Sequence, residues 1–198
     1  MSLIKLKNNA LDNLTSFEGS ASLGDMVFIS SATASSSASI EFTLGDYKEY
    51  KFFFVNIHPS VDAARWTFQA STDNGSSYGV TITSTAFAAY HGENDTFNGL
   101  GYTTAQDLAQ STSFKQLVRE VGSDNDQNTS GILQIFNPAS SVYVKHFISR
   151  FSDIQENDAA RDDFTAGYFN SVSPLTNIKF QMSSGNIDDG KILMFGLN

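Results

Sequence analysis

The sequence contains no cysteine, and only 3 of its 198 residues are proline. Without cysteine the chain has no disulfides, no thiolate nucleophile and no cysteine metal site. Apolar runs such as Phe52–Val55 fall far short of the ~20 residues that cross a membrane as a helix, so we expect no membrane partner. The segment Met1–Asn9 lacks the apolar stretch of a signal peptide, which predicts a chain made in the cytoplasm that keeps its N-terminus.

Basic residues are scarce, with 12 Lys and Arg against 21 Asp and Glu, and the formal net charge is −9. The basic residues are scattered singly, so no patch exists that could release counterions from a phosphate backbone. We therefore expect no nucleic-acid partner. A net charge of this size favours solubility and says nothing about the fold.

Aromatic residues are abundant, with 17 Phe, 7 Tyr and 1 Trp, and aromatic side chains suit the half-buried surface of a sheet. Apolar and polar residues alternate strictly in 39–44, 65–70 and 177–182, which predicts half-buried strands. Further strands are expected in 26–29, 50–57, 78–82, 132–136, 142–151, 164–169 and 191–195. About ten short strands separated by turn signals predict an all-β fold, a jelly-roll-like antiparallel β-sandwich with under about a tenth of the residues helical.

Two stretches are ambiguous. Apolar residues in 113–121 fit a helix, but a strand over 115–121 is favoured because Gly122 opens a polar loop that leads into 132–136, as in a hairpin. The Ser/Ala/Thr-rich segment 30–39 fits either a linker or an extended edge segment.

The predicted organisation is an N-terminal arm over residues 1–24 and one sandwich domain over residues 25–198. Leu3, Ile4 and Leu6 could dock the arm on a neighbouring molecule, and the arm would order only on binding. Long loops are expected at 83–110 and 153–163, where partner contacts are usually made. Tyr90 and Tyr102 fall in the first of these loops and are candidate contact residues.

No catalytic constellation emerges from the sequence. His58, His91 and His146 are far apart in the chain and lack companions at metal-ligand spacing. The segment Gly75–Gly79 matches a serine-hydrolase elbow by letter, but it follows a turn signal instead of joining a strand to a helix. Asp124–Asn128 begins like a calcium loop and then lacks the required Gly and Glu. We therefore expect no catalytic residues, no bound cofactor and no metal.

Two other patterns bear on carbohydrate chemistry. The carboxylates at 93–95 and 188–189 could serve a glycosidase only if they faced each other across a cleft. Trp66 could form a sugar platform, but its alternation with Phe68 favours a place in the core.

Three stretches carry a resemblance to a known group of proteins: residues 54–59, 142–149 and 182–197, the last a Ser/Gly turn followed by a strand ending in Phe-Gly-Leu. They resemble virion structural proteins of tailed, particularly marine, bacteriophages, of the capsid-decoration, head-fibre or tail-fibre type. The similarity runs from about residue 20 to the end. It implies a jelly-roll-like subunit without enzymatic activity, made in the host cytoplasm and located in the virion.

The same resemblance implies the partners: further copies of this chain, most often as a trimer in this class, and other virion proteins. The chain lacks the long repetitive shaft of a full-length tail fibre, which favours a small decoration or short-fibre subunit. The alternative hypothesis is a lectin-like module that binds a host-surface glycan, and the least favoured is an enzyme.

Overall fold

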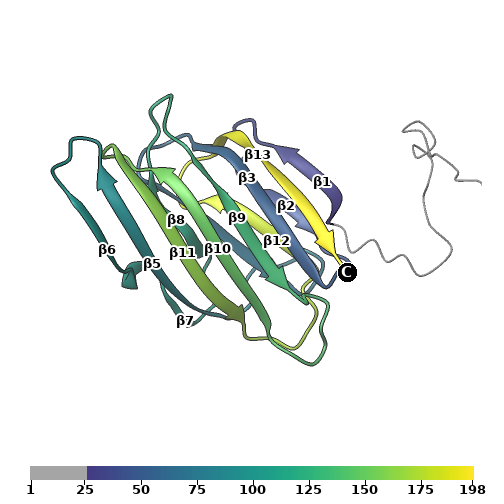
Figure 1. Ribbon diagram of the computed structural model, residues 1–198. Helices are drawn as coiled ribbons and strands as arrows, with labels where there is room; N and C mark the ends of the chain where they lie inside the picture. The colour runs from purple at the N-terminus through teal and green to yellow at the C-terminus, as the bar shows by residue number, and fades with distance from the viewer. Residues whose placement is uncertain (1–25) are drawn as a thin grey trace, which may run out of the picture.

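The computed structural model describes residues 26–198 and folds them into two antiparallel sheets packed face to face (Figure 1). The strands of the large sheet are, in spatial order, β1 (Val27–Thr33), β13 (Ile187–Leu197), β3 (Glu49–Pro59), β9 (Thr129–Phe136), β10 (Lys145–Ile154), β11 (Ala159–Phe169), β5 (Ile82–Gly92) and β6 (Asn98–Tyr102), and β7 (Leu108–Ser111) also pairs with β5. The small sheet contains, in spatial order, β2 (Ile40–Thr43), β12 (Asn177–Met182), β4 (Ala64–Ser71) and β8 (Lys115–Val121).

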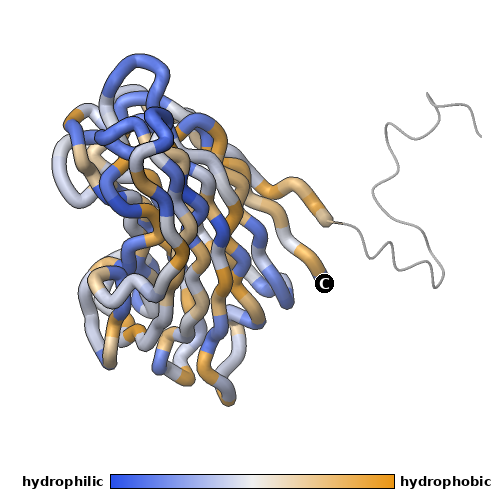
Figure 2. The backbone as a smooth tube through the Cα atoms, turned by 60° about the vertical axis from the view of Figure 1, so that its left-hand side comes forward, coloured by the Kyte–Doolittle hydropathy of each residue, from blue (hydrophilic) through white to orange (hydrophobic). Residues whose placement is uncertain are grey.

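The connectivity has the wrapped character of a jelly roll. The first strand pairs with the last, β1 with β13, and the second pairs with the second-last, β2 with β12. From β1 to β5 the chain alternates between the large and the small sheet, so consecutive strands mostly face each other across the core. Hydrophobic residues follow the strands in Figure 2, and the loops at one end of the sandwich are hydrophilic.

Aromatic rings fill the space between the sheets. Phe180 of β12 lies at the centre, with its ring centroid 5.1 Å from that of Phe54 and 5.3 Å from that of Phe52. Trp66 of β4 stacks on Phe180 at 5.8 Å and is fully buried, which confirms its predicted place in the core. Apolar burial on this scale is the main stabilising contribution to such a fold.

The predicted all-β sandwich is confirmed, with thirteen strands where about ten were expected. Among the described residues the helical content is one 3₁₀ turn, η2 (Thr104–Gln106). The ambiguous segment 113–121 forms a strand, β8, as favoured. The first residues of 30–39 belong to the edge strand β1, so this segment is an edge and not a linker. Within residues 26–198, no helix has the length and apolar character needed to cross a membrane.

The predictions of two long loops were both wrong. The stretch 83–110 consists mainly of β5, β6, η2 and part of β7, and its signal was weak because the buried positions of β5 hold small residues, Ala86 and Ala88. The stretch 153–163 contains the end of β10, a tight turn at 155–158 and the beginning of β11. Its strands were missed because their inward side chains there are charged or polar, as at Asp153 and Arg161.

Other boundaries and pairings also differ from the predictions. Residues 78–81 and 142–144 precede strands and do not belong to them. The turn at Asn74 and Gly75 has two positive φ values, 59° and 82°, but it leads from the small sheet to the large one and forms no hairpin. The expected hairpin of 115–121 with 132–136 is likewise a crossover, since β8 and β9 lie in different sheets. Turn chemistry marks where the chain reverses, and only packing decides which strand it meets next.

Gly190 provides a test of the strand pairing between β13 and β3, where the register shifts. Its φ is +121°, and a Cβ built there would lie 2.7 Å from the backbone oxygen of Asn56. We expect Gly190→Ala to lower the free energy of unfolding by at least about 2 kcal/mol, because it adds backbone strain to a collision that cannot be relieved by a side-chain rotation. Urea denaturation checks this. Gly79→Ala, whose Cβ would make an ordinary 3.8 Å contact, is the matched control, and equal losses in both variants would contradict the argument.

Candidate functional site

A continuous row of side chains crosses the outer face of the large sheet, the face that no strand of residues 26–198 covers. The strand register places its members directly opposite one another on seven neighbouring strands: Tyr102, Phe87, Phe164, Arg150, Ile132, Phe53 and Leu193. With ~4.8 Å between strands, this outer row is roughly 29 Å long. Six of its seven members are aromatic or aliphatic, so the row is an apolar stripe on the surface.

The centre of the outer row is rigidly packed. The rings of Phe87 and Phe164 stack with centroids 4.6 Å apart and planes within 5°. The guanidinium carbon of Arg150 lies 4.7 Å above the Phe164 ring, and Arg150 donates from Nε and Nη2 to the two oxygens of Asp162 at 3.0 and 2.7 Å. An exposed ion pair of this kind adds little stability, but its fork geometry orients the guanidinium over the ring.

Beside these rings the outer face is hollowed into an apolar groove of about 460 Å³. Phe87, Ile132 and Ile148 line this groove with 46%, 41% and 47% of their surface exposed. Large apolar side chains that are exposed together, and not singly, mark interaction surfaces on proteins. The groove therefore suits an apolar partner surface better than a hydroxyl-rich ligand.

The small sheet ends at β8, whereas the large sheet continues through β5 and β6. A second hollow, the inter-sheet cleft, is lined by residues of β5, β6, β8 and β11. Its volume is about 300 Å³. Tyr90 of β5, Arg161 of β11 and Arg119 of β8 line it, together with the β6 backbone at Gly99 and Gly101. The cleft thus combines the aromatic ring of Tyr90, two guanidinium groups and two glycines of an edge strand.

A bulge in β8 sets the position of Arg119. Val118 and Val121 pair with Trp66 and Ala64, so two residues of β8, Arg119 and Glu120, lie opposite the single residue between these partners. Glu120 has a φ of 57°, in the left-handed region that non-glycine residues rarely adopt. Bulges redirect side chains at sheet edges, and this one carries Arg119 to the rim of the cleft.

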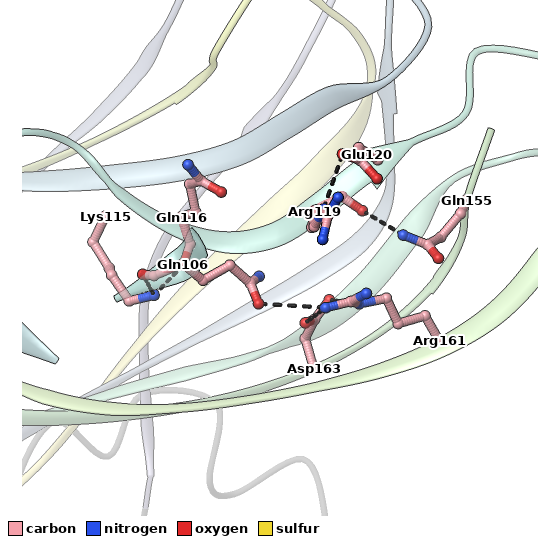
Figure 3. Close-up of polar contacts among 8 residues, drawn as sticks. All are labelled: Gln106, Lys115, Gln116, Arg119, Glu120, Gln155, Arg161 and Asp163. Carbon is pink, nitrogen blue, oxygen red and sulfur yellow. Dashed lines mark hydrogen bonds and ion pairs between the residues drawn. The ribbon is translucent and has the colours of Figure 1, made fainter. Parts of the chain in front are cut away.

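Beneath the cleft lies a buried polar network (Figure 3). Arg161 binds Asp163 through two hydrogen bonds of 3.0 Å, and its Nη2 also donates to Oε1 of Gln106 at 3.4 Å. Lys115 donates from Nζ to the backbone oxygens of Gln106 at 2.7 Å and Gln116 at 2.6 Å. Burial lowers the pKa of Lys115 to about 8, although the negative charges of Asp107 and Asp163 act in the opposite direction. These contacts compensate the burial of both cations, although Nη1 of Arg161 has no acceptor among residues 26–198.

Asp153 completes this network from β10, opposite Arg161 in the strand register. Its side chain is buried, and neither carboxyl oxygen accepts a hydrogen bond from the described residues. Desolvation, reinforced by the nearby charge of Asp163, raises the pKa of Asp153 to about 9, and Arg161 offsets only part of this. Asp153 is therefore neutral at pH 7 and has a proton to share with Asp163.

The structure places the predicted contact residues in different settings. Tyr90 and Tyr102 lie on paired strands, β5 and β6, and not in a loop. Both border the inter-sheet cleft, with Tyr90 over Gly99, while the register sets Tyr102 opposite Phe87 at the end of the outer row. Leu3, Ile4 and Leu6 lie outside the described residues, so their role in docking stays a prediction.

The residues considered for chemistry remain apart. His58 contacts the backbone oxygen of Gln127, and His91 contacts Asp95 at the surface. The carboxylates at 93–95 follow β5 and those at 188–189 belong to β13; four strands separate these two strands in the sheet, a distance of roughly 24 Å, so they do not face each other across a cleft. Within 26–198, no group of three or more His, Asp or Glu residues could hold a metal ion.

The sequence analysis did not identify five residues of the cleft and its polar network: Lys115, Arg119, Asp153, Arg161 and Asp163. One signal could have found part of this set: Arg161 and Asp163 are oppositely charged and two residues apart, the spacing that puts them on one face of a strand. Unless the strand itself is recognised, however, two charged residues at this spacing predict an exposed loop.

Comparisons of this chain with protein-family models, with curated proteins and with solved structures find no match.

Proposed function

We propose that this chain is a non-enzymatic structural protein of a bacteriophage virion, a jelly-roll-like subunit that decorates the head or forms a short fibre or tail component. The observation that carries the proposal is the apolar outer row with its groove. In a subunit that packs against neighbours, an exposed apolar face of this kind is covered by the neighbouring subunit. The closely packed side chains at the centre of the outer row suit a contact of fixed geometry. The virion as the assembly comes from the resemblance of three segments of the sequence to phage virion proteins.

Assembly with other subunits would also cover the edge strands of the sandwich. A sandwich has edge strands whose unpaired backbone groups attract other chains, and symmetric assembly is one way to cover them. We propose that the partners are further copies of this chain, as a trimer, and other virion proteins. The inner core needs no partner, since the aromatic residues between the sheets are already buried.

The test changes the groove without touching the core. We expect the double variant Phe87→Ser, Ile148→Ser to fold and to enter phage particles at a severalfold lower level than the unchanged chain, because both side chains would lose apolar contacts with a neighbour. Quantitative mass spectrometry of purified particles measures this. Val142→Ser, Val172→Ser is the matched control, since these valines are more exposed, at 65% and 56%, and lie outside the groove.

Two results would contradict the proposal in different ways. Undiminished incorporation of the groove variant would remove the outer row from the assembly mechanism. Absence of the unchanged chain from purified particles would overturn the virion role itself.

A further inference from the structure

The inter-sheet cleft presents hydrogen-bond donors that the described part of the chain leaves free. Arg161 uses Nε and Nη2 on Asp163 and Gln106, and no acceptor from 26–198 contacts its Nη1. Nε of Arg119 forms an ion pair with Oε1 of Glu120 at 2.9 Å, and the two terminal nitrogens of Arg119 have no acceptor among these residues. A ligand that completes these bonds must be rich in acceptor oxygens.

The charges around the cleft permit that ligand to be an anion, although the whole chain carries −9. Asp163 balances Arg161, and Asp153, the buried carboxyl opposite Arg161 in the strand register, is neutral at pH 7. Glu120 pairs with Nε of Arg119 and leaves the opposite side of that guanidinium open. The two terminal nitrogens of Arg119 and the free Nη1 of Arg161 are donors that suit the two oxygens of a carboxylate.

The remaining walls suit a sugar ring. Tyr90 contributes an aromatic ring, and the apolar or partly apolar faces of pyranoses stack on such rings. Gly101 lies opposite Ala88 in the register, and a Cβ built on Gly101 meets nothing within 4 Å, so the floor is open and flat. The volume, about 300 Å³, lies at the lower end of the range for small-molecule sites.

From these observations we propose that the inter-sheet cleft binds an acidic saccharide, with its carboxylate between Arg119 and Arg161 and its ring against Tyr90. This goes beyond the structural role proposed above, and it gives a subunit fixed on a particle a means to hold a uronate-bearing glycan. The outer row meets the cleft only at Tyr102, and the groove residues Phe87 and Ile148 do not line the cleft, so the two proposals can be tested separately.

The experiment is isothermal titration of the purified full chain with a short oligogalacturonate, with a neutral oligosaccharide of the same length and with inorganic phosphate. We expect saturable binding of the oligogalacturonate, binding at least about tenfold weaker for the neutral sugar, and at least about tenfold weaker binding of the uronate by Arg119→Gln. Tyr90→Ala is expected to lose binding as well, and Tyr90→Phe, which keeps the ring, to retain it. Tyr143→Ala is the matched control, because Tyr143 is 70% exposed and lies outside the cleft.

Several outcomes would overturn the proposal: no saturable uronate binding by the unchanged, folded chain; equal affinity for the neutral sugar; phosphate binding of equal strength; or unchanged affinity in Arg119→Gln. Circular dichroism of each variant shows that it is folded, and Arg119 is a partly exposed residue on an edge strand, so its replacement leaves the core intact. The groove variant Phe87→Ser, Ile148→Ser is expected to bind uronate normally. Failure of sugar binding with normal particle incorporation would therefore refute this inference alone.

Discussion

Phe180→Ala is expected to lower the free energy of unfolding by about 3–5 kcal/mol, the usual cost of deleting a buried phenyl ring. Phe180 is fully buried at the centre of the inner face of the small sheet. Its ring lies within 6.4 Å of five other aromatic rings, those of Phe42, Phe52, Phe54, Trp66 and Phe68. Rings held by strands of both sheets cannot all move into the space that alanine would leave, so a cavity persists. Urea denaturation of the full chain at pH 7 measures the loss.

Trp66→Phe is the control for this prediction. It keeps an aromatic ring in the same cluster, and the indole nitrogen that it removes has no acceptor among the described residues, so no hydrogen bond is lost. We expect a cost of about 1–2 kcal/mol, well below that of Phe180→Ala. A loss under about 1 kcal/mol for Phe180→Ala would show that the aromatic cluster between the sheets collapses readily into the space left by the ring.

The core could be predicted from the sequence because its strands follow the period of two without interruption. In 39–44, 65–70 and 177–182 every second residue is apolar, and these segments contain β2, most of β4 and β12. Trp66 could be assigned to the core for the same reason. In each case one face of the strand is apolar and lies in the core, as the alternation predicts, although in β4 the polar residues Thr67 and Gln69 are buried as well.

The inter-sheet cleft could not be predicted, because the same rule fails there. At 153–163 the inward positions hold Asp153, Arg161 and Asp163, and a strand with charged residues on its inner face looks like a loop. Arg161 and Asp163 are tolerated inside because they pair with each other, and Asp153 because it is protonated; its place beside them depends on a register between strands that the sequence does not display. Local sequence rules are expected to fail at such sites, where stability is traded for a polar interior.

Asp153→Asn is expected to stabilise the protein at neutral and mildly alkaline pH, by an amount that grows with pH. The pKa of Asp153 is raised to about 9 in the folded chain, against about 3.9 for a free aspartate, so the folded state holds a proton that the unfolded state releases. A raised folded-state pKa contributes stability that is complete below the unfolded pKa and is lost as pH rises toward the folded pKa. Between about pH 4 and 9 the unchanged chain therefore loses stability with rising pH, at up to about 1.4 kcal/mol per pH unit from this group.

Asparagine removes the titration and keeps a donor for Asp163, so the variant and the unchanged chain should have similar stability near pH 4 and differ by on the order of a few kcal/mol at pH 7.5. Urea midpoints at pH 5, 6, 7 and 7.5 measure the divergence. The series stops there because the pKa of Lys115, lowered to about 8, makes stability rise with pH above that value and would oppose the effect. Asp162→Asn, on the outward side of the same strand pair, loses only its exposed pairing with Arg150 and should give a small, pH-independent change. Parallel curves for Asp153→Asn and the unchanged chain would mean that Asp153 is ionised in the fold, and the neutral carboxyl beneath the inter-sheet cleft would have to be abandoned.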